Sequence, residues 1–363
     1  MAKLGWASYS LSPMQITDIS VEGHERVVRA IDDASGLHAY IAVHDTTFGP
    51  GLGGLRMWPY ETADEALTDV LRLSEGMTYK SALARTGVGG GKAVIMGDPA
   101  SAKSEALYLA MGRFIDSLNG LYITAEDVNT RVADLEIVRR ETRWVTGLSR
   151  EMGGSGNPSP YTGLGVFLGV EAAVRWRFGV DGVRGRRVAV QGVGAVGSAL
   201  VRRLAEAGAE VVVADRHRDR VEALVAELGV EAVPEDQILS QEVDVLAPCA
   251  LGAVFTDETI PTLRCQIVAG AANNVLHEPR HGEELERRGI LYAPDYVINS
   301  GGIINVAAEL AEGGYDSEDV LRRIRRIPEA LEEIWRAAKE RGISASAAAD
   351  RLAIETLGRG VGA

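Results

Sequence analysis

The first part of the chain alternates between strand-like and helix-like hydrophobic patterns. Two apolar runs rich in β-branched residues, 25–31 and 37–45, predict strands, and the polar, glycine-rich stretch 46–56 predicts a turn. From Thr62 onward, apolar residues recur at helical spacing behind a Thr-x-x-Glu capping box, which predicts a helix that begins at this threonine. Three more elements are predicted in this part: a strand over 93–96, a helix over 106–120 and a strand over 121–127.

The stretch 153–160, GGSGNPSP, marks a boundary, because past it strands and helices alternate regularly. This alternation predicts an α/β fold with a parallel sheet and helices on both of its faces. The pattern predicts a further helix near the C-terminus, with Ser344 as its cap. The predicted strands lie in 188–194, 210–215, 243–248, 266–271 and 290–296, and the predicted helices begin at Ala195 and span 218–228.

Composition narrows the class of protein. The 363 residues are 46% hydrophobic and 25% charged, with a net charge of −13 and no basic stripe, which argues against nucleic acid or a membrane surface as partner. No apolar run approaches the ~20 residues of a membrane helix, and the N-terminus does not resemble a signal peptide. Cys249 and Cys265 lack the spacing of metal ligands, so we expect reduced cysteines, no metal and a cytoplasmic protein that acts on small molecules.

A glycine motif, Gly-x-Gly-x-x-Gly over 192–197, stands directly behind a β-branched strand and before a helix. This context predicts a dinucleotide site: the glycines allow a tight turn and close approach to the pyrophosphate, and the helix N-terminus supplies N–H groups. An acid, Asp215, ends the next strand, where it favours NAD over NADP, although Arg216 and Arg218 follow it. The predicted cofactor-binding residues here are Gly192, Val193, Gly194, Ala195, Val196, Gly197, Asp215 and Arg216.

Two lysines and an aspartate stand in unusual surroundings. Lys80 falls near the apolar stripe of the helix that begins at Thr62, and Lys92 follows three glycines and precedes a buried strand. Asp127 lies where a strand ends. Taken singly, Lys80 is explained by a lysine that extends to solvent from a helix end, and Asp127 by a turn or cap residue. Together with a dinucleotide site, two cations and a carboxylate fit an amino acid or a 2-oxo acid as substrate.

These residues belong to motifs whose order resembles one family. The motifs are LGGLRMWPY, GMTYK, GGGKAVI, TAEDVNT, SGNPSPYT, VQGVGAVG, APCALGA, AGAANN and YAPDYVINSGGIINVAAEL. From about residue 25 to about 355 the chain resembles the amino acid dehydrogenases that include the leucine, valine, phenylalanine, tryptophan and glutamate enzymes, with the leucine and valine branch closest. The resemblance implies reversible, NAD-dependent oxidative deamination of an L-amino acid to a 2-oxo acid and ammonia.

The resemblance also implies two domains. Residues 1–148 form a mixed α/β domain for substrate binding and oligomerisation, and 149–341 form a Rossmann domain for NAD. The active site lies in the cleft between them, and a helix over 342–363 packs back on the first domain. The resemblance implies a homo-oligomer, and we expect at least a dimer. The chain stops soon after DRLAIETLGRG, whereas leucine dehydrogenases tend to carry a longer tail used in assembly, which argues against their octamer here.

Roles follow from the resemblance residue by residue. Lys92 is implied as the catalytic lysine that activates water, Asp127 as the carboxylate that moves protons, and Lys80 as the lysine that binds the substrate carboxylate. Gly53 and Gly54 are implied to lie in a turn against the substrate. The remaining implied cofactor contacts are Thr162, Ala247, Pro248, Cys249 and Asn273, the last of which also contacts substrate.

Side-chain specificity is implied at four apolar positions: Leu52, Ala125, Ile303 and Val306. Leu52 stands where glutamate enzymes carry a lysine, so a charged substrate side chain would find no partner there. Aromatic-specific relatives tend to have glycine at the position of Ala125, so leucine, valine and isoleucine are the predicted substrates. Two alternatives remain open at this point: an aromatic amino acid dehydrogenase, and a non-catalytic NAD-binding sensor.

Overall fold

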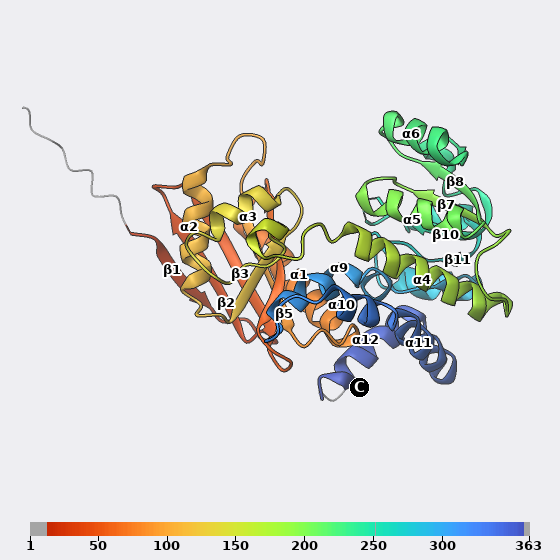
Figure 1. Cartoon of the computed structure of the whole chain (residues 1–363). Helices are drawn as coiled ribbons and strands as arrows, with labels where there is room; N and C mark the ends of the chain where they lie inside the picture. The colour runs from red at the N-terminus through yellow and green to blue at the C-terminus, as the bar shows by residue number, and fades with distance from the viewer. Residues whose placement is uncertain (1–12, 251, 359–363) are drawn as a thin grey trace, which may run out of the picture. The chain divides into compact units, whose positions relative to one another are not determined.

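The computed structural model describes residues 13–250 and 252–358, and the chain divides into two compact units (Figure 1). The first unit comprises the chain up to Thr78 together with Val88–Gly154. The second comprises Tyr79–Gly87 and the chain from Ser155 onward. Among the described residues, none of the helices is both long and apolar enough to span a membrane.

A six-stranded mixed sheet forms the centre of the first unit, in the order β1-β2-β3-β5-β4-β6. Neighbours from β1 to β5 are antiparallel, whereas β4 runs parallel to both β5 and β6. One face packs its apolar side chains against α2 and α3, and the other packs against α1 (Figure 1). The elements are β1 (Gln15–Ile19), β2 (Arg26–Asp32), β3 (Leu37–Asp45), β4 (Gly51–Trp58), α1 (Ala63–Leu83), β5 (Gly89–Met96), α2 (Glu105–Asp116), β6 (Tyr122–Glu126) and α3 (Val132–Val138).

The predicted turn over 46–56 is wrong beyond its first residues, because β4 begins at Gly51 and runs through the middle of the sheet. The strand was not predicted because glycines at its start leave the sequence without the alternation of hydrophobic and polar residues that indicates a strand. They are needed for packing: a Cβ on Gly53 would lie 1.8 Å from the carbonyl oxygen of Gly91 on β5. For the same reason β5 begins at Gly89, four residues before the predicted start.

Several predicted elements of the first unit are confirmed. The helix α1 begins directly after Thr62, whose Oγ1 accepts a hydrogen bond of 3.1 Å from the Glu65 N–H. The strands β2, β3 and β6 and the helix α2 lie where the hydrophobic pattern placed them.

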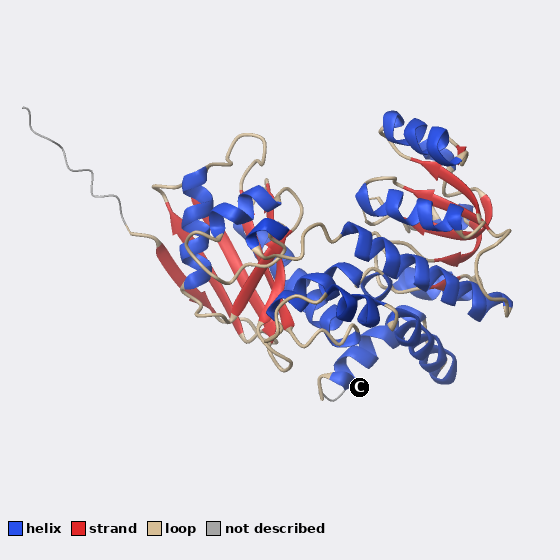
Figure 2. Ribbon diagram, viewed as in Figure 1, coloured by secondary structure: helices blue, strands red, loops and turns tan. Residues whose placement is uncertain are grey.

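The second unit is a doubly wound α/β domain, as predicted. Its six strands are all parallel, in the order β12-β11-β10-β7-β8-β9, and helices flank the sheet (Figure 2). The strands are β7 (Arg187–Gln191), β8 (Glu210–Ala214), β9 (Glu231–Ala232), β10 (Glu242–Pro248), β11 (Arg264–Val268) and β12 (Leu291–Tyr292). The helices are α4 (Ser159–Phe178), α5 (Ala195–Glu206), α6 (Arg218–Leu228), α7 (Arg280–Arg287), α8 (Asp295–Ile298), α9 (Gly301–Ala307), α10 (Ser317–Ile324), α11 (Ile327–Arg341) and α12 (Ala345–Thr356).

The C-terminal helix α12 is grouped with the second unit, whereas the sequence suggested a boundary near 341 and a return to the first domain. Its buried alanines, among them Ala345 and Ala349, join the core that also contains Trp335 of α11. The predicted cap at Ser344 is confirmed, because its Oγ accepts a hydrogen bond from the Ala347 N–H.

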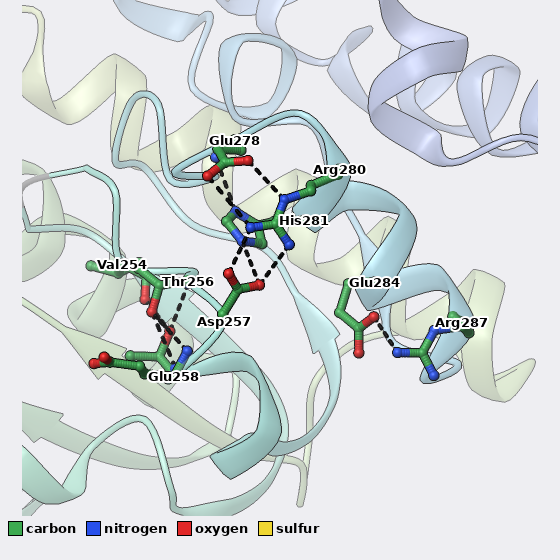
Figure 3. A network of polar contacts seen from close by, with 10 residues as sticks. Val254, Thr256, Asp257, Glu258, Glu278, Arg280, His281, Glu284 and Arg287 are labelled. Atoms are coloured by element: carbon green, nitrogen blue, oxygen red, sulfur yellow. Dashed lines mark hydrogen bonds and ion pairs between the residues drawn. The ribbon is translucent and has the colours of Figure 1, made fainter.

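A network of hydrogen bonds and ion pairs connects the segment that follows β10 with the segment that follows β11 (Figure 3). The Arg280 guanidinium donates to both carboxylate oxygens of Asp257 at 2.6 Å, and its hydrogen bonds hold the pKa of Asp257 at about 2. The Glu278 N–H donates to Nδ1 of His281 at 2.9 Å, which leaves Nε2 as the donor to Asp257 at 3.3 Å. The network therefore ties the segment after β10 to the start of α7.

Candidate active site

Lys92 and Asp127 form an ion pair in the first unit, with 2.8 Å between Nζ and Oδ2. Lys92 lies on β5 and is only 5% exposed; its neighbour Ala93 belongs to the core on the α2 face, so strand alternation turns Lys92 to the α1 face. Asp127 directly follows β6, and β4 runs between β5 and β6. Gly54 of β4 leaves the space for this contact, because a Cβ there would lie 2.5 Å from the Asp127 Cβ.

Arg56 also contacts Asp127, a partner that the sequence analysis did not identify. Its Nε donates to the same Oδ2 at 3.1 Å. Burial alone raises the pKa of Asp127, but the charges of Lys92 and then Arg56, with their hydrogen bonds, outweigh burial and hold this pKa below its ordinary value. Asp127 is therefore ionised at neutral pH and able to accept a proton.

Lys80 lies in the second unit, in the last turn of α1, and donates a hydrogen bond of 2.6 Å from Nζ to Oδ1 of Asn299. Asn299 is buried at the end of α8, and its Nδ2 donates to Oδ1 of Asn273 at 2.6 Å and to the carbonyl of Ala271 at 3.0 Å. The structure thus connects two predicted site residues, Lys80 and Asn273, through Asn299. Asn299 was missed, although a polar residue directly before Ser-Gly-Gly within the motif was a usable signal.

Lys80 also lies near a buried carboxyl group. Burial raises the pKa of Asp295, and hydrogen bonds from backbone N–H groups and the charge of Lys80 oppose that effect. Its oxygens accept hydrogen bonds from the backbone N–H groups of Val275, at 3.0 Å, and Tyr296, at 2.6 Å. Asp295 therefore organises the backbone beside Asn273 and Asn299.

The glycine motif adopts the geometry that a dinucleotide needs. Gly192 has φ +91°, a conformation that favours glycine, and a Cβ on Gly197 would lie 2.0 Å from the carbonyl oxygen of Gly192. Gly194 caps α5, and its missing side chain leaves open space, since a Cβ there would reach its nearest atom only at 4.0 Å. Backbone N–H groups at the start of α5 can therefore approach a pyrophosphate closely.

Asp215 follows β8 and closes this turn. Its Oδ2 accepts a hydrogen bond of 2.7 Å from the Val193 N–H, and its Oδ1 accepts one of 2.8 Å from the His217 N–H. Burial raises its pKa, but these hydrogen bonds and nearby cations outweigh burial and lower the pKa overall. A cavity of about 810 Å³ opens beside Asp215 and is lined by Arg216 and Arg218 and by the segment 232–236. The residues present fit the adenosine half of a dinucleotide.

Three other predicted cofactor contacts, Ala247, Pro248 and Cys249, lie where β10 ends beside the end of β7. Ala247 and Pro248 end β10, and the Cys249 N–H donates to the carbonyl of Gln191 at 2.7 Å, next to the glycine turn. Burial raises the pKa of the Cys249 thiol to about 12, so it stays protonated. Thr162 lies in the first turn of α4, where its Oγ1 donates to the carbonyl of Pro158 at 3.2 Å.

The four residues predicted to set side-chain specificity are divided between the units. Leu52 on β4 and Ala125 on β6 are buried in the first unit, and Ile303 and Val306 on α9 are buried in the second. All four are apolar, and their joint role as a pocket stays a prediction.

The sequence matches two profiles of one family. Residues 21–144 match the dimerisation domain of the Glu/Leu/Phe/Val dehydrogenases, and residues 153–217 and 213–360 match the glutamate/leucine/phenylalanine/valine dehydrogenase domain. The identification from motifs in the sequence is therefore confirmed.

Individual relatives are similar along nearly their whole length. A leucine dehydrogenase of Geobacillus stearothermophilus is 51% identical over 92% of this chain and 90% of its own. A valine dehydrogenase of Streptomyces virginiae is 49% identical over 92% and 94%. Among solved structures, the L-tryptophan dehydrogenase of Nostoc punctiforme superposes with a TM-score of 0.81, at 43% identity over 93% of this chain and 96% of that one. The chain belongs to the Glu/Leu/Phe/Val family of amino acid dehydrogenases.

Proposed function

We propose that this enzyme catalyses the reversible, NAD-dependent oxidative deamination of a branched-chain L-amino acid (leucine, valine or isoleucine) to the 2-oxo acid and ammonia. The observation that carries the proposal is the buried Lys92 paired with an ionised Asp127 at 2.8 Å. Relatives about 50% identical are leucine and valine dehydrogenases, which supports the substrate class.

Asp127 and Lys92 divide the proton transfers between them. Deamination needs a neutral substrate amine, and the Asp127 carboxylate, whose pKa lies below its ordinary value, accepts the proton that the ammonium form loses. Lys92 holds the water that adds to the iminium carbon, and the proton that this water loses passes to the Lys92–Asp127 pair, so that a neutral carbinolamine forms. The pair then protonates the nitrogen, ammonia leaves as the carbon–oxygen double bond forms, and the hydroxyl proton is released.

The substrate carboxylate binds at Lys80 in this proposal. Asn299 accepts a hydrogen bond from the Lys80 Nζ and donates to Asn273, so the ammonium group is oriented before substrate arrives. The turn 192–197 and Asp215 would hold NAD, which supplies the hydride acceptor when bound. The side chain of the substrate meets aliphatic groups, Leu52 and Ala125 in the first unit, which favour an uncharged substrate.

A panel of L-amino acids with NAD, followed by NADH absorbance, tests the proposal. Leucine, valine and isoleucine should be the best substrates, and glutamate should react poorly. A tenfold advantage for phenylalanine or tryptophan would assign the enzyme to the aromatic class instead.

Lys92→Ala should still bind NAD while its turnover falls by a factor of about 10²–10⁴, the usual contribution of a positioned proton-transfer group. Near-normal turnover would remove Lys92 from the mechanism, and no turnover by the unaltered protein would favour a sensor.

We further propose a cytoplasmic homo-oligomer, a dimer or larger. The first unit matches a domain described as a dimerisation domain, and both cysteines are free thiols in the structure, as in a reducing compartment. Light scattering coupled to gel filtration tests the assembly: a single species at 38.7 kDa would contradict it.

A further inference from the structure

Arg56 lies between two carboxylates on the α1 face of the first sheet. Its Nε donates to Oδ2 of Asp127 at 3.1 Å, and its Nη1 donates to Oδ2 of Asp69, on α1, at 2.9 Å. The Tyr60 hydroxyl donates to that same Asp69 oxygen at 2.6 Å. Burial and the hydrogen bond to Asp69 raise the pKa of Tyr60, so the hydroxyl stays a donor. Arg56 is thus anchored on the side opposite Asp127.

The two cations meet Asp127 at one oxygen. The Lys92 Nζ lies 2.8 Å from Oδ2, the oxygen to which the Arg56 Nε donates, and no hydrogen bond from a described residue reaches Oδ1. This division leaves Oδ1 as the oxygen that can accept a proton from substrate. When Lys92 contacts water or substrate, the Asp127 carboxylate still has Arg56 as a cationic partner. The guanidinium of Arg56 stays charged at every working pH.

Exposure supports a functional location for these charges. The side chains of Arg56, Asp69 and Asp127 are 20%, 17% and 23% exposed, so each is partly desolvated and its charge is only weakly screened. Arg72 also reaches Asp69, at 3.3 Å, but from solvent. Arg56 is therefore the link between the helix α1 and the carboxylate at the end of β6.

We propose that Arg56 is a positioning residue for the reaction: held by Asp69 and Tyr60, it fixes the orientation of Asp127 and keeps its Oδ1 directed to the substrate nitrogen. The proposal rests on the proposed function for its catalytic consequence. Arg56 itself need not touch substrate or cofactor.

The test compares Arg56→Gln, Arg56→Lys and a matched control, Lys103→Gln. The control removes a similarly buried ion pair of the same unit, Lys103 with Asp134 at 2.6 Å, and neither of these groups is among the charges that act on Asp127. Arg56→Gln should lower kcat about ten- to a hundredfold, part of the contribution of a proton-transfer group, with a smaller change in KM. The acid limb of its kcat/KM profile should move to higher pH, because Asp127 loses a cation. Arg56→Lys should return the acid limb of the kcat/KM profile to the pH seen in the unaltered enzyme, but it should recover only part of kcat.

A readout without turnover separates this inference from the proposed function. The Asp127 carboxyl is labelled with ¹³C and titrated by NMR, and its signal is assigned by its loss in Asp127→Asn. Arg56→Gln should raise the midpoint of that signal, while Lys103→Gln leaves it unchanged. If the unaltered protein oxidises no L-amino acid, the proposed function fails, and the titration still decides whether Arg56 controls the charge of Asp127.

An unchanged midpoint and an unchanged pH profile in Arg56→Gln would overturn the proposal, as would an equal shift in Lys103→Gln. Should Arg56→Gln fail to fold, Tyr60→Phe removes only one hydroxyl from the anchor. It should still lower kcat severalfold, and wild-type kinetics in that variant would also overturn the proposal.

Discussion

Gly54 leaves the space in which Lys92 and Asp127, the proposed catalytic pair, come into contact. It lies on β4, between β5, which carries Lys92, and β6, which Asp127 directly follows. A Cβ at Gly54 would lie 2.5 Å from the Asp127 Cβ and 2.8 Å from the Glu126 carbonyl oxygen. Non-bonded carbons rest at about 3.5–4.0 Å, so Gly54→Ala must displace Asp127 by ~1 Å. The 2.8 Å separation between the Lys92 Nζ and the Asp127 Oδ2, lengthened by that amount, exceeds the range of a hydrogen bond.

The consequence for rate is large because proton transfer depends on geometry. A misplacement of ~1 Å costs about 10²-fold, so kcat of Gly54→Ala with L-leucine or L-valine and NAD should fall about a hundredfold. The fold should also lose stability, by about 1–3 kcal/mol, because the added methyl group overpacks a buried site against the Glu126 carbonyl oxygen.

The matched control is Gly76→Ala on α1. A Cβ at Gly76 meets no atom within 4 Å, so this variant should keep its kcat and gain about 0.5–1 kcal/mol of helix stability. NADH absorbance gives the rates, and urea unfolding gives the stabilities. If Gly54→Ala turned over substrate like the unaltered enzyme while folded, the steric explanation for this glycine would be refuted.

Three further predictions follow from the hydrogen bonds of the site. Asp215→Ser should reduce the preference for NAD over NADP at least tenfold in kcat/KM, because the carboxylate that repels a 2′-phosphate is gone. Asn299→Ala should raise KM for the amino acid about tenfold with a smaller effect on kcat, since Lys80 loses its 2.6 Å partner in both ground and transition states. Asp127 has a folded pKa below its ordinary value, so its stabilising contribution is present above pH ~4 and is lost as the pH falls through the folded pKa. Urea midpoints should therefore fall more between pH 5 and pH 2 in the unaltered protein than in Asp127→Asn.

The sequence predicted the second unit well because its strands are buried on both faces and regularly spaced by helices. Where the hydrophobic period was absent, prediction failed. The strand β4 was assigned as a turn because glycines occupy its first half, and the helix α4 was not predicted because glycines and apolar residues occur around its circumference. In both places packing against neighbours, which a local pattern does not contain, determines the structure.

Prediction of the candidate site residues from the sequence was limited for a similar reason. Lys92 and Asp127 were found because their types and strand positions suggested chemistry, and the structure places them in contact. Asn299 is 219 positions from its partner Lys80, a separation at which no local spacing indicates contact. Arg56 lies in the motif LGGLRMWPY, but the role proposed for it depends on its hydrogen bond to Asp69 of α1. That contact becomes visible only when α1 packs on the sheet.

Four charges beside the end of β6 pair with one another: Lys92 and Arg56 with Asp127, and Arg56 also with Asp69. A partly buried charge left without a partner destabilises a protein more than loss of the whole pair does. Arg56→Gln and Asp69→Asn should therefore each destabilise, whereas the double variant restores neutrality and should be more stable than the sum of the single effects predicts. Its kcat should stay as low as that of Arg56→Gln, because Asp127 still lacks Arg56 and keeps Lys92 as its partner. If the changes in unfolding free energy were additive, Arg56 and Asp69 would not be coupled. If kcat recovered in the double variant, catalysis would require balanced charge and not the hydrogen bond from Arg56 to Asp127.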